Sequence, residues 1–310
     1  KKVCIGLSGG VDSSVAALLL KQQGYDVFGL FMQNWHDAST TLHGDCEWEE
    51  DRFVAEMVAR KIGIPFYFVD LSKEYRQRVV DYMFDEYEKG RTPNPDVLCN
   101  REIKFDAFLK CAKKLGADYV ATGHYCRKET FDGADGQVHR ILAGADPNKD
   151  QSYFLWRLTQ QQLARTIFPL GGWEKPQVLE YLKEHNLQSA AKEGESMEVC
   201  FIPGDYRDFL RANVPGIDSS PGSGPFVDSE GRTLGKHCGY PFYTVGQRKG
   251  LGIALGQPAY VIKINPAKNT VMLGSEEQLV AHYMLVDEPQ WTGGLPDGLT
   301  VRVRYRSRPI

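Results

Sequence analysis

The feature that most constrains this chain is a glycine- and serine-rich segment near its N-terminus, Gly6-Leu7-Ser8-Gly9-Gly10-Val11-Asp12-Ser13-Ser14. An apolar run, Val3-Cys4-Ile5, precedes it, and apolar residues at helical spacing follow it as far as Gly24. This pattern predicts a strand, a glycine turn and a helix. The turn directs backbone N–H groups and a helix N-terminus at one spot, and its adjacent glycines let an anion come close. The segment therefore predicts a phosphate-binding loop, with an ordinary glycine turn as the structural alternative.

This loop differs from the two common phosphate-binding patterns. The usual P-loop ends in Gly-Lys-Ser/Thr, a tripeptide that the sequence lacks, and the segment does not follow Gly-x-Gly-x-x-Gly either. Hydroxyl groups of Ser8, Ser13 and Ser14 are instead available as additional donors to an anion.

Strand-like and helix-like segments alternate over the first 125 residues. The predicted strands are 3–5, 27–32, 65–69 and 119–122, and the predicted later helices are 49–62, 72–88 and about 100–115. Such alternation predicts an α/β domain with a doubly wound parallel sheet. Because ligands bind at the carboxyl ends of the strands of such a sheet, we expect Ser8, Met32, Gly123 and His124 around one pocket. His124 is equally well explained as a structural histidine.

Composition bounds the class of protein. A chain of 310 residues with 42% hydrophobic and 25% charged residues is typical of a globular protein of two or three domains. No apolar stretch approaches 18 residues and no signal-peptide pattern is present, so we expect no membrane span and no secretion. The net charge of −3 neither indicates nor excludes binding of nucleic acid.

The cysteines indicate a reducing compartment. Seven are present, an odd number, and they form no Cys-x-x-Cys pair. This usage favours a reduced, cytoplasmic protein with one or two working thiols over a disulfide scaffold. The seven are Cys4, Cys46, Cys99, Cys111, Cys126, Cys200 and Cys238.

A proline-stiffened segment, Thr92-Pro93-Asn94-Pro95-Asp96-Val97-Leu98-Cys99-Asn100, lies between two predicted helices. Cys99 is expected just before, or in the first turn of, the following helix, where the helix dipole favours a thiolate. Asp96 is suited to cap that helix or to act as a base. In the structural alternative Asp96 only caps the helix and Cys99 only packs.

Taken together, these segments resemble those of the tRNA-specific 2-thiouridylases, which are ATP pyrophosphatases of the adenine-nucleotide alpha-hydrolase type. The resemblance covers nearly the whole chain. It rests on motifs in the same order: the Ser8–Ser13 loop, the segment 92–100 followed by Lys104-Phe105, Ala121-Thr122-Gly123-His124-Tyr125, Lys149-Asp150-Gln151-Ser152-Tyr153-Phe154-Leu155, and Cys200-Phe201-Ile202.

The resemblance implies a role for individual residues. Cys99 corresponds to the active-site nucleophile and Cys200 to the persulfide carrier, with Asp96 as a candidate general base or acid. ATP would be bound by Gly6, Leu7, Ser8, Gly9, Gly10, Val11, Asp12, Ser13, Met32 and Gly123. tRNA would be contacted by Asn94, Pro95, Asp96, Lys149, Asp150, Gln151, Arg304 and Tyr305.

The implied activity is the ATP-dependent replacement of the 2-oxygen of the wobble uridine of tRNA by sulfur. Adenylation of that oxygen would make AMP the leaving group, with Mg²⁺ offsetting the phosphate charge. The uridine would be flipped out of its stack, and sulfur would come from a donor protein as a persulfide on Cys200. Either the terminal sulfur attacks C2, or Cys99 attacks the persulfide, releasing sulfide and leaving a Cys99–Cys200 disulfide bond.

Alternatives to this chemistry remain open. Cys99, Cys200 and Asp96 are also candidate ligands of an iron–sulfur cluster, although they form no tight cysteine motif. Cys200 alone reads equally as a buried thiol on a strand. It follows Glu195-Ser196-Met197-Glu198-Val199, where the family more often has Asp-Ser-Thr-Gly-Ile.

From Phe201 onward glycine and proline become frequent, and short alternating segments at 225–227, 260–264 and 270–273 predict β structure. We therefore expect a catalytic domain at 1–203, a small β-rich central domain at 204–272, and the start of a C-terminal β-barrel at 273–310. The barrel is expected to be incomplete, because family members run on beyond Ile310. A basic turn at 243–251 carries Arg248 and Lys249.

Arginine recurs at every second residue from Arg302 to Arg308. On a single strand these arginines share one face, which suits binding of phosphates, while a charge-guarded edge strand is the structural alternative.

Two rival functions are weighed against the thiouridylase hypothesis. Another ATP pyrophosphatase, acting on tRNA or forming an amide, would share the first loop but would not need Cys99 and Cys200. A non-catalytic tRNA-binding protein would keep the arginines but would not need the nucleotide loop.

Overall fold

The computed structural model describes residues 1–34, 47–133, 136–187, 205–280, 286, 289–291, 304–305 and 308–309. The chain forms two compact units. The first comprises residues 1–80, 95–201 and 290–294, and the second comprises 81–94, 202–289 and 295–310. The domain boundaries expected at 203 and 272 stay predictions. Within the described residues no helix is both long and apolar enough to cross a membrane.

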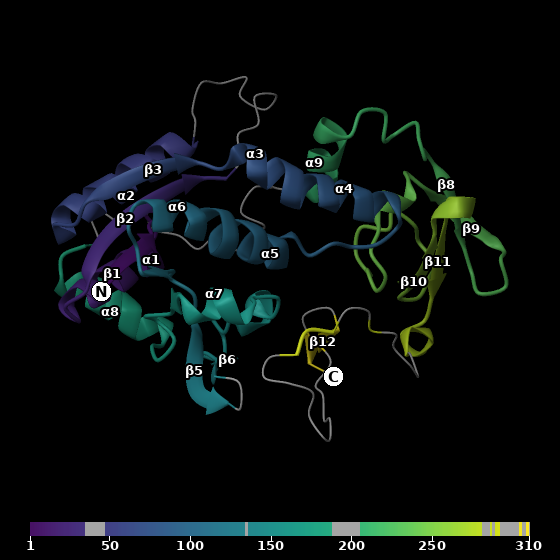
Figure 1. The fold of residues 1–310 in the computed structure, drawn as a ribbon. Helices are drawn as coiled ribbons and strands as arrows, with labels where there is room; N and C mark the ends of the chain where they lie inside the picture. Colours follow the sequence, from purple (N-terminus) through teal and green to yellow (C-terminus); the bar gives the residue numbers. More distant parts are fainter. Residues whose placement is uncertain are drawn as a thin grey trace. The chain divides into compact units, whose positions relative to one another are not determined.

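The first unit is built on a parallel sheet, as the alternating sequence pattern predicts. Its strand order is β3-β2-β1-β4-β7. Strands β1, β2 and β3 are labelled in Figure 1. Four strands match predicted ones, and the short fifth, β7, was not predicted. The strands are β1 (Lys2–Gly6), β2 (Asp26–Gln33), β3 (Phe66–Asp70), β4 (Tyr119–Ala121) and β7 (Thr166–Ile167).

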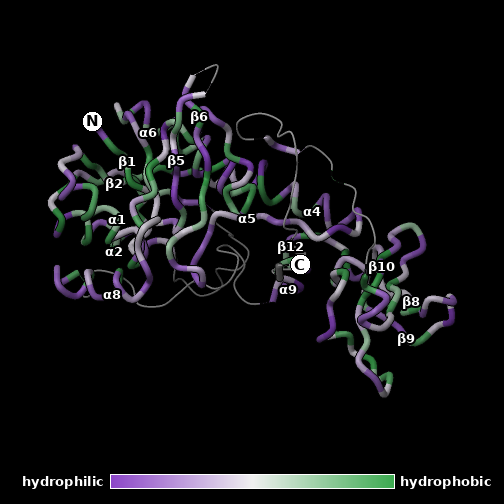
Figure 2. The backbone as a smooth tube through the Cα atoms, turned by 90° about the horizontal axis from the view of Figure 1, so that it is seen from below, coloured by the Kyte–Doolittle hydropathy of each residue, from purple (hydrophilic) through white to green (hydrophobic). Residues whose placement is uncertain are grey.

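Alternation along β1 divides the core into two layers, because successive side chains of a strand point to opposite faces. Val3 and Ile5 pack with buried residues of α1 (Val11–Gln22), α2 (Glu47–Ile62) and α8 (Lys175–Glu184). Gly6 faces the ring of Phe108 on the other side, where α6 (Phe108–Lys114) runs. Helices therefore cover both faces, and the predicted doubly wound α/β fold is confirmed. The hydrophobic stretches of Figure 2 follow β1, β2 and α1.

Two predicted helices each contain a wide-turned, π-helical segment. The helix predicted at 72–88 consists of α3 (Ser72–Tyr75), the π-helix η1 (Arg76–Val80) and α4 (Asp81–Glu88). The helix predicted from about 100 begins earlier and consists of α5 (Pro95–Leu98), the π-helix η2 (Cys99–Ala107) and α6. Sequence periodicity did not indicate the wide turns.

The helices and strands that follow β4 in the first unit were not predicted from sequence patterns. β5 (Cys126–Gly133) and β6 (Gly136–Ala143) form an antiparallel pair in continuous register from Cys126↔Ala143 to Gly133↔Gly136. The 3₁₀ helix η3 (Ser152–Leu155) and the helix α7 (Gln160–Ala164) follow. The Thr159 hydroxyl caps α7 by accepting the Gln162 N–H at 3.3 Å.

The second unit contains the predicted β structure. Its sheet has the order β10-β11-β8-β9, with β8 (Gly224–Val227), β9 (Thr233–His237), β10 (Tyr260–Asn265) and β11 (Thr270–Gly274). Phe226, Phe242, Val261 and Val271 are fully buried at its core. The short helices of this unit are α9 (Tyr206–Asn213), η4 (Tyr240–Phe242), η5 (Pro266–Lys268) and η6 (Glu277–Leu279).

Helix α4 belongs to this second unit. Its Phe84 and Tyr87 rings lie 6.1 Å from Phe209 and 5.9 Å from Tyr206, ring centre to ring centre. The Thr92 hydroxyl, in the chain after α4, donates to the hydroxyl oxygen of Thr244 at 3.0 Å.

The expectation of one continuous arginine-bearing strand near the C-terminus is wrong. β12 (Arg304–Tyr305) and β13 (Arg308–Pro309) pair with each other in antiparallel fashion, so the chain reverses between them. Period-two patterning tells which residues share a face while a strand continues, but it does not encode where the strand turns. Arg302 and Arg306 lie outside the described residues.

Candidate functional site

The predicted phosphate-binding loop joins β1 to α1. Leu7 continues the sheet by donating its N–H to the Leu30 carbonyl at 3.2 Å, and the chain then turns at Ser8 and Gly9. The Ser8 N–H donates to the Ser13 hydroxyl at 3.2 Å. The hydroxyls of Ser13 and Ser14 both donate to the Gly10 carbonyl, at 3.1 and 2.8 Å. The serines thus hold the loop around the N-terminus of α1, where partial positive charge favours an anion.

Two glycines are required by close packing around this loop. Gly9 has a φ of +81°, and a Cβ there would lie 2.9 Å from the Asp51 carbonyl oxygen of α2. Gly123 follows β4, and a Cβ there would lie 3.0 Å from the backbone nitrogen of Ser13. The end of β4 therefore presses directly on the first turn of α1, as expected if both border one pocket. Met32 is the last residue but one of β2, is half-buried, and pairs with Val69 of β3.

Asp12 is engaged by two side chains from distant parts of the chain. The Lys175 ammonium, at the start of α8, lies 2.8 Å from Asp12 Oδ1, and the Tyr125 hydroxyl donates to the same oxygen at 2.7 Å. The Lys175 side chain is only 14% exposed. This cation beside the loop was missed by sequence reasoning, because 163 residues separate it from Asp12 and no local pattern marks it.

His124 is a core residue. Its Nδ1 lies 2.7 Å from the Thr122 hydroxyl, and its ring contacts those of Phe105 and Phe168. Burial holds the pKa of His124 well below its ordinary value, and the nearby charge of Lys104 acts in the same direction. These contacts favour the structural alternative of a neutral histidine.

Asp96 and Cys99 lie at the start of the helical run 95–114. Asp96 is the second residue of α5 rather than the residue before the helix, so its expected capping position is wrong. The expectation that Cys99 lies just before the helix or in its first turn is also wrong, because the helical run begins at Pro95 and Cys99, the first residue of η2, is its fifth residue. Burial raises the pKa of the Asp96 carboxyl, and the positive charge of Lys104 opposes that rise. The Cys99 side chain is 1% exposed. Thus a carboxyl with a raised pKa and a buried thiol lie within one turn of helix, as a proton-transfer site would need.

Asn100, next to Cys99, has an incompletely paired side chain. Its Nδ2 donates to the Phe154 carbonyl at 3.3 Å, while its Oδ1 is buried and has no hydrogen-bond partner among the described residues. This contact ties η2 to η3.

Lys149, Asp150 and Gln151 form a loop that contacts Tyr125. Gln151 exchanges two hydrogen bonds of 3.0 Å with the backbone of Tyr125, through its own N–H and its side-chain oxygen. The Asp150 carboxylate accepts from the N–H groups of Gly144 and Ser152 at 2.9 and 3.1 Å. The Asp150 and Gln151 side chains therefore order this loop, and Lys149 beside them is half-buried.

Four other predicted site residues lie outside the described residues or in the second unit. Cys200 lies outside the described residues. Asn94 belongs to the second unit, whereas Pro95 and Asp96 belong to the first. Arg304 and Tyr305 form β12, which is assigned to the second unit.

The described residues show no metal-ligand cluster, and the two cavities described below are not lined by the predicted site residues. In the part of the chain that the structure describes, no three His, Cys, Asp or Glu side chains are grouped as metal ligands. A cavity of about 470 Å³ lies in the second unit at 248–259, and one of about 350 Å³ lies between the C-terminal ends of α1, α2 and α8. Neither is lined by the loop or by Asp96, so the site is better defined by packing and chemistry than by enclosed volume.

Comparison with known families assigns most of the chain. The family described as tRNA methyl transferase HUP domain matches residues 1–204, and the tRNA methyl transferase PRC-barrel domain matches residues 208–275.

Named relatives are similar over the full chain. The chain is 51% identical to a tRNA-specific 2-thiouridylase, MnmA 3, of Bacteroides fragilis, over 100% of the chain and 82% of that protein. It is 46% identical to the tRNA-specific 2-thiouridylase MnmA of Syntrophomonas wolfei, over 99% of the chain and 85% of that protein.

A solved 4-thiouridine synthetase–RNA complex with bound ATP matches 61% of this chain and 42% of that protein, with a TM-score of 0.35 and 18% identity. This likeness is too distant to assign a function.

The likeness to the two named 2-thiouridylases over the full length of this chain is decisive, and it agrees with the order of motifs in the sequence. The chain belongs to the family of tRNA-specific 2-thiouridylases.

Proposed function

We propose that this protein is a tRNA-uridine 2-sulfurtransferase of the cytoplasm that thiolates the wobble uridine of tRNA at the expense of ATP. The observation that carries the proposal is the 51% identity, over the whole chain, to a relative named as a tRNA-specific 2-thiouridylase. The built loop at the start of α1 and the carboxyl–thiol pair on the helix 95–114 support it.

ATP would bind with its phosphates at the loop Gly6–Ser13. Backbone N–H groups at the start of α1 and the hydroxyl of Ser8, which is exposed, are available to phosphate oxygens. Gly123 lets the chain after β4 come close, and Met32 would contact the nucleoside. Lys175 adds a cation beside the loop, where it would offset charge on the departing pyrophosphate.

Mg²⁺ would arrive bound to the triphosphate, because Asp12, the carboxylate of the loop, already accepts from Lys175 and Tyr125. Oxygen ligands from phosphate suit this ion. Its role would be to neutralise charge during transfer of the adenylyl group.

The chemistry at uridine needs activation because the 2-oxygen is a poor leaving group. Transfer of AMP from ATP to that oxygen would release pyrophosphate and give an adenylated uridine. Attack of sulfur on C2 would then expel AMP. A carboxyl with a raised pKa, such as Asp96, is suited to exchange a proton with the base at neutral pH.

Sulfur would reach the uridine through Cys200, loaded as a persulfide by a donor protein. In one route the terminal sulfur of the persulfide attacks C2 and expels AMP; the Cys99 thiolate then attacks Sγ of Cys200, which breaks the S–S bond, frees 2-thiouridine and leaves a Cys99–Cys200 disulfide. In the other, the Cys99 thiolate attacks the inner sulfur of the Cys200 persulfide, sulfide leaves and attacks C2, and a Cys99–Cys200 disulfide remains to be reduced. An iron–sulfur cluster held by Cys99, Cys200 and Asp96 is a third arrangement, through which we derive no step.

tRNA would be held by Asn94, Pro95 and Asp96 around the flipped uridine, by the loop 149–151, and by Arg304 and Tyr305. The loop 149–151 is pre-ordered by its contacts with Tyr125, which lowers the entropy cost of binding.

The experiment that tests this function is incubation, without air, of the purified protein with ATP, Mg²⁺, unmodified tRNA and sulfide, followed by mass spectrometry of the digested tRNA. We expect 2-thiouridine that depends on ATP, and pyrophosphate release that depends on tRNA. Binding of tRNA with no release of pyrophosphate would instead favour a non-catalytic binding protein. Thiolation at another uridine position would favour a different ATP pyrophosphatase.

A further inference from the structure

The helix that carries Cys99 is wound with an unusually wide turn. From Cys99 to Ala107 it is π-helical, and at its end the Phe108 N–H donates to the carbonyl of Ile103, five residues earlier. In an ordinary α-helix each N–H donates to the carbonyl four residues earlier. π-Helical turns, in which the spacing is five residues, are rare and mostly occur as one turn inside an α-helix. A stretch of nine such residues requires support from outside the helix.

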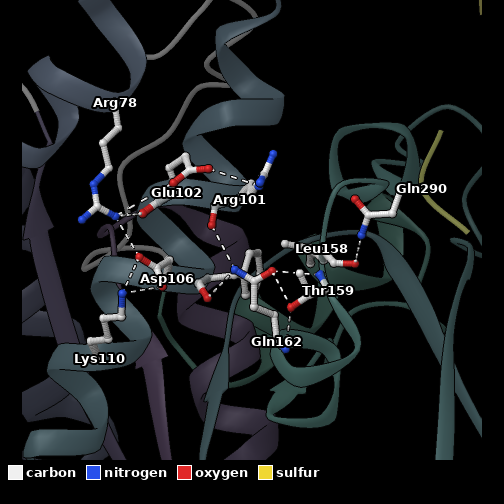
Figure 3. Close-up of polar contacts among 10 residues, drawn as sticks. Arg78, Arg101, Glu102, Asp106, Lys110, Leu158, Thr159, Gln162 and Gln290 are labelled. Atoms are coloured by element: carbon white, nitrogen blue, oxygen red, sulfur yellow. Dashed lines mark hydrogen bonds and ion pairs between the residues drawn. The ribbon is translucent and has the colours of Figure 1, made fainter. Parts of the chain in front are cut away.

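That support comes from side chains that donate to carbonyl groups of the wide segment. The Gln162 side-chain amide of α7 donates to the carbonyls of Arg101 and Phe105, at 3.1 and 3.0 Å (Figure 3). The Arg78 guanidinium of η1 donates to the carbonyl of Glu102 at 3.4 Å. Each bond gives a carbonyl of the segment a side-chain donor from another element.

The other end of the Gln162 amide fixes its direction. Its Oε1 accepts from the N–H and the hydroxyl of Thr159, at 2.9 and 3.1 Å. The amide nitrogen is therefore aimed at η2, and the amide cannot flip without placing N–H against N–H.

An ion-pair cluster secures the opposite side of the segment. Asp106 lies 2.8 Å from both the Arg78 guanidinium and the Lys110 ammonium (Figure 3). Partial burial opposes ionisation of Asp106, but the hydrogen bonds from Lys110 and Arg78 outweigh it and lower the pKa of its carboxyl. All three side chains are partly exposed, so each pair contributes modestly.

We propose that Gln162 is a positioning residue that holds η2 in its wide register and thereby sets where Asp96 and Cys99 lie. The proposal rests on the proposed function, in which these two residues meet the uridine. A shift of η2 by one residue would rotate α5, the helix that precedes it, by about 100° and translate α5 by about 1.5 Å relative to α6. A displacement of this size is enough to lower a rate by roughly 10²-fold.

The test compares Gln162→Glu with Gln177→Glu. Gln177 occupies the same capping position in α8, where its Oε1 accepts from the Glu174 N–H at 2.8 Å, and no contact links it to η2 in the described structure. Glutamate keeps the side-chain oxygen that accepts the capping hydrogen bond at both positions. Only at position 162 does the substitution remove the amide N–H groups that donate to carbonyls of η2. Gln162→Met serves as a second, uncharged variant.

We expect both Gln162 variants to thiolate tRNA with a kcat roughly 10²-fold below wild type, with KM for ATP within about twofold. Amide hydrogen exchange at 99–107 should become faster in them and stay at the wild-type rate in Gln177→Glu. A kcat equal to that of Gln177→Glu overturns the proposal. So does a crystal structure of Gln162→Glu that keeps the Phe108-to-Ile103 bond.

Failure of the proposed function is distinguishable from failure of this inference. If the wild-type protein makes no 2-thiouridine, hydrogen exchange still decides whether Gln162 holds the register. Faster exchange at 99–107 in the Gln162 variants alone supports the positioning role, and unchanged exchange overturns it.

Discussion

Replacement of Gly9 by alanine tests whether the fold, rather than the ligand, shapes the phosphate-binding loop. Gly9 has a φ of +81°, and an added Cβ would lie 2.9 Å from the Asp51 carbonyl oxygen and 3.1 Å from the Ala55 nitrogen. The left-handed backbone costs about 1–2 kcal/mol for a residue with a Cβ. Overpacking against the backbone of α2 adds about 1–3 kcal/mol. We therefore expect Gly9→Ala to lower the free energy of unfolding by about 2–5 kcal/mol.

Gly10→Ala is the matched control. Among the described residues, a Cβ at Gly10 would meet only the Ser8 hydroxyl, at 3.6 Å, and the Gly10 backbone is in an extended conformation that any residue adopts. Its free energy of unfolding should stay within about 0.5 kcal/mol of wild type. Urea denaturation of the ATP-free proteins makes the comparison. The reasoning is refuted if Gly9→Ala is no less stable than Gly10→Ala.

Three further predictions concern charge and protonation. Lys175→Met should raise the Kd for ATP about tenfold, measured by calorimetry. Lys183→Met, at the exposed end of the same helix, should leave the Kd unchanged. Equal Kd values for the two variants would show that Lys175 does not belong to the nucleotide site. Because burial lowers the pKa of His124, the folded protein binds fewer protons than the unfolded chain below about pH 6.5, so stability should fall on acidification through that pH. His124→Gln should fall less steeply in urea titrations at pH 5.5 and 7.5, and an identical slope would contradict the assignment. Since Lys104 opposes the raised pKa of Asp96, Lys104→Met should move the limb of the kcat profile that reports Asp96 to higher pH, and an unmoved profile would show that Asp96 does not titrate in catalysis.

Local patterns were sufficient to predict the sheet and the loop. Val3 and Ile5 alternate with Cys4 along β1, and the glycines of the loop directly precede the apolar face of α1. Each signal lies within a few residues, where hydrophobic period and turn chemistry act. For the same reason the β structure of the second unit was predictable from short alternating segments.

Features that depend on distant contacts were not predictable in this way. Lys175 reaches Asp12 across 163 residues, and the wide register of η2 depends on the donors Gln162 and Arg78 from other elements. Neither the Lys175–Asp12 ion pair nor the side-chain hydrogen bonds to η2 produce a periodic pattern in the sequence around these residues. The arginine row failed for a related reason, because alternation continues through the point where the chain reverses.

The candidate site was predictable as a set of residues rather than as a geometry. The motifs placed Asp96 and Cys99 together, and the structure adds that one carboxyl pKa is raised by burial and that the thiol is buried. Cys200, which the motifs also predict at this site, lies outside the described residues, and its place there stays a prediction.

The most direct test of the account follows the oxygen that sulfur replaces. The protein would be given ATP, Mg²⁺, a small-molecule persulfide as the sulfur source and an anticodon stem-loop whose target uridine carries ¹⁸O at the 2-position, without air, and both AMP and the RNA would be analysed by mass spectrometry. Cys111→Ser, at a half-buried position of α6, would serve as the control for Cys99→Ser. The account predicts one ¹⁸O-labelled AMP for each 2-thiouridine formed, with 2-thiouridine lost in Cys99→Ser and retained in Cys111→Ser. 2-Thiouridine accompanied by unlabelled AMP would contradict an adenylated uridine.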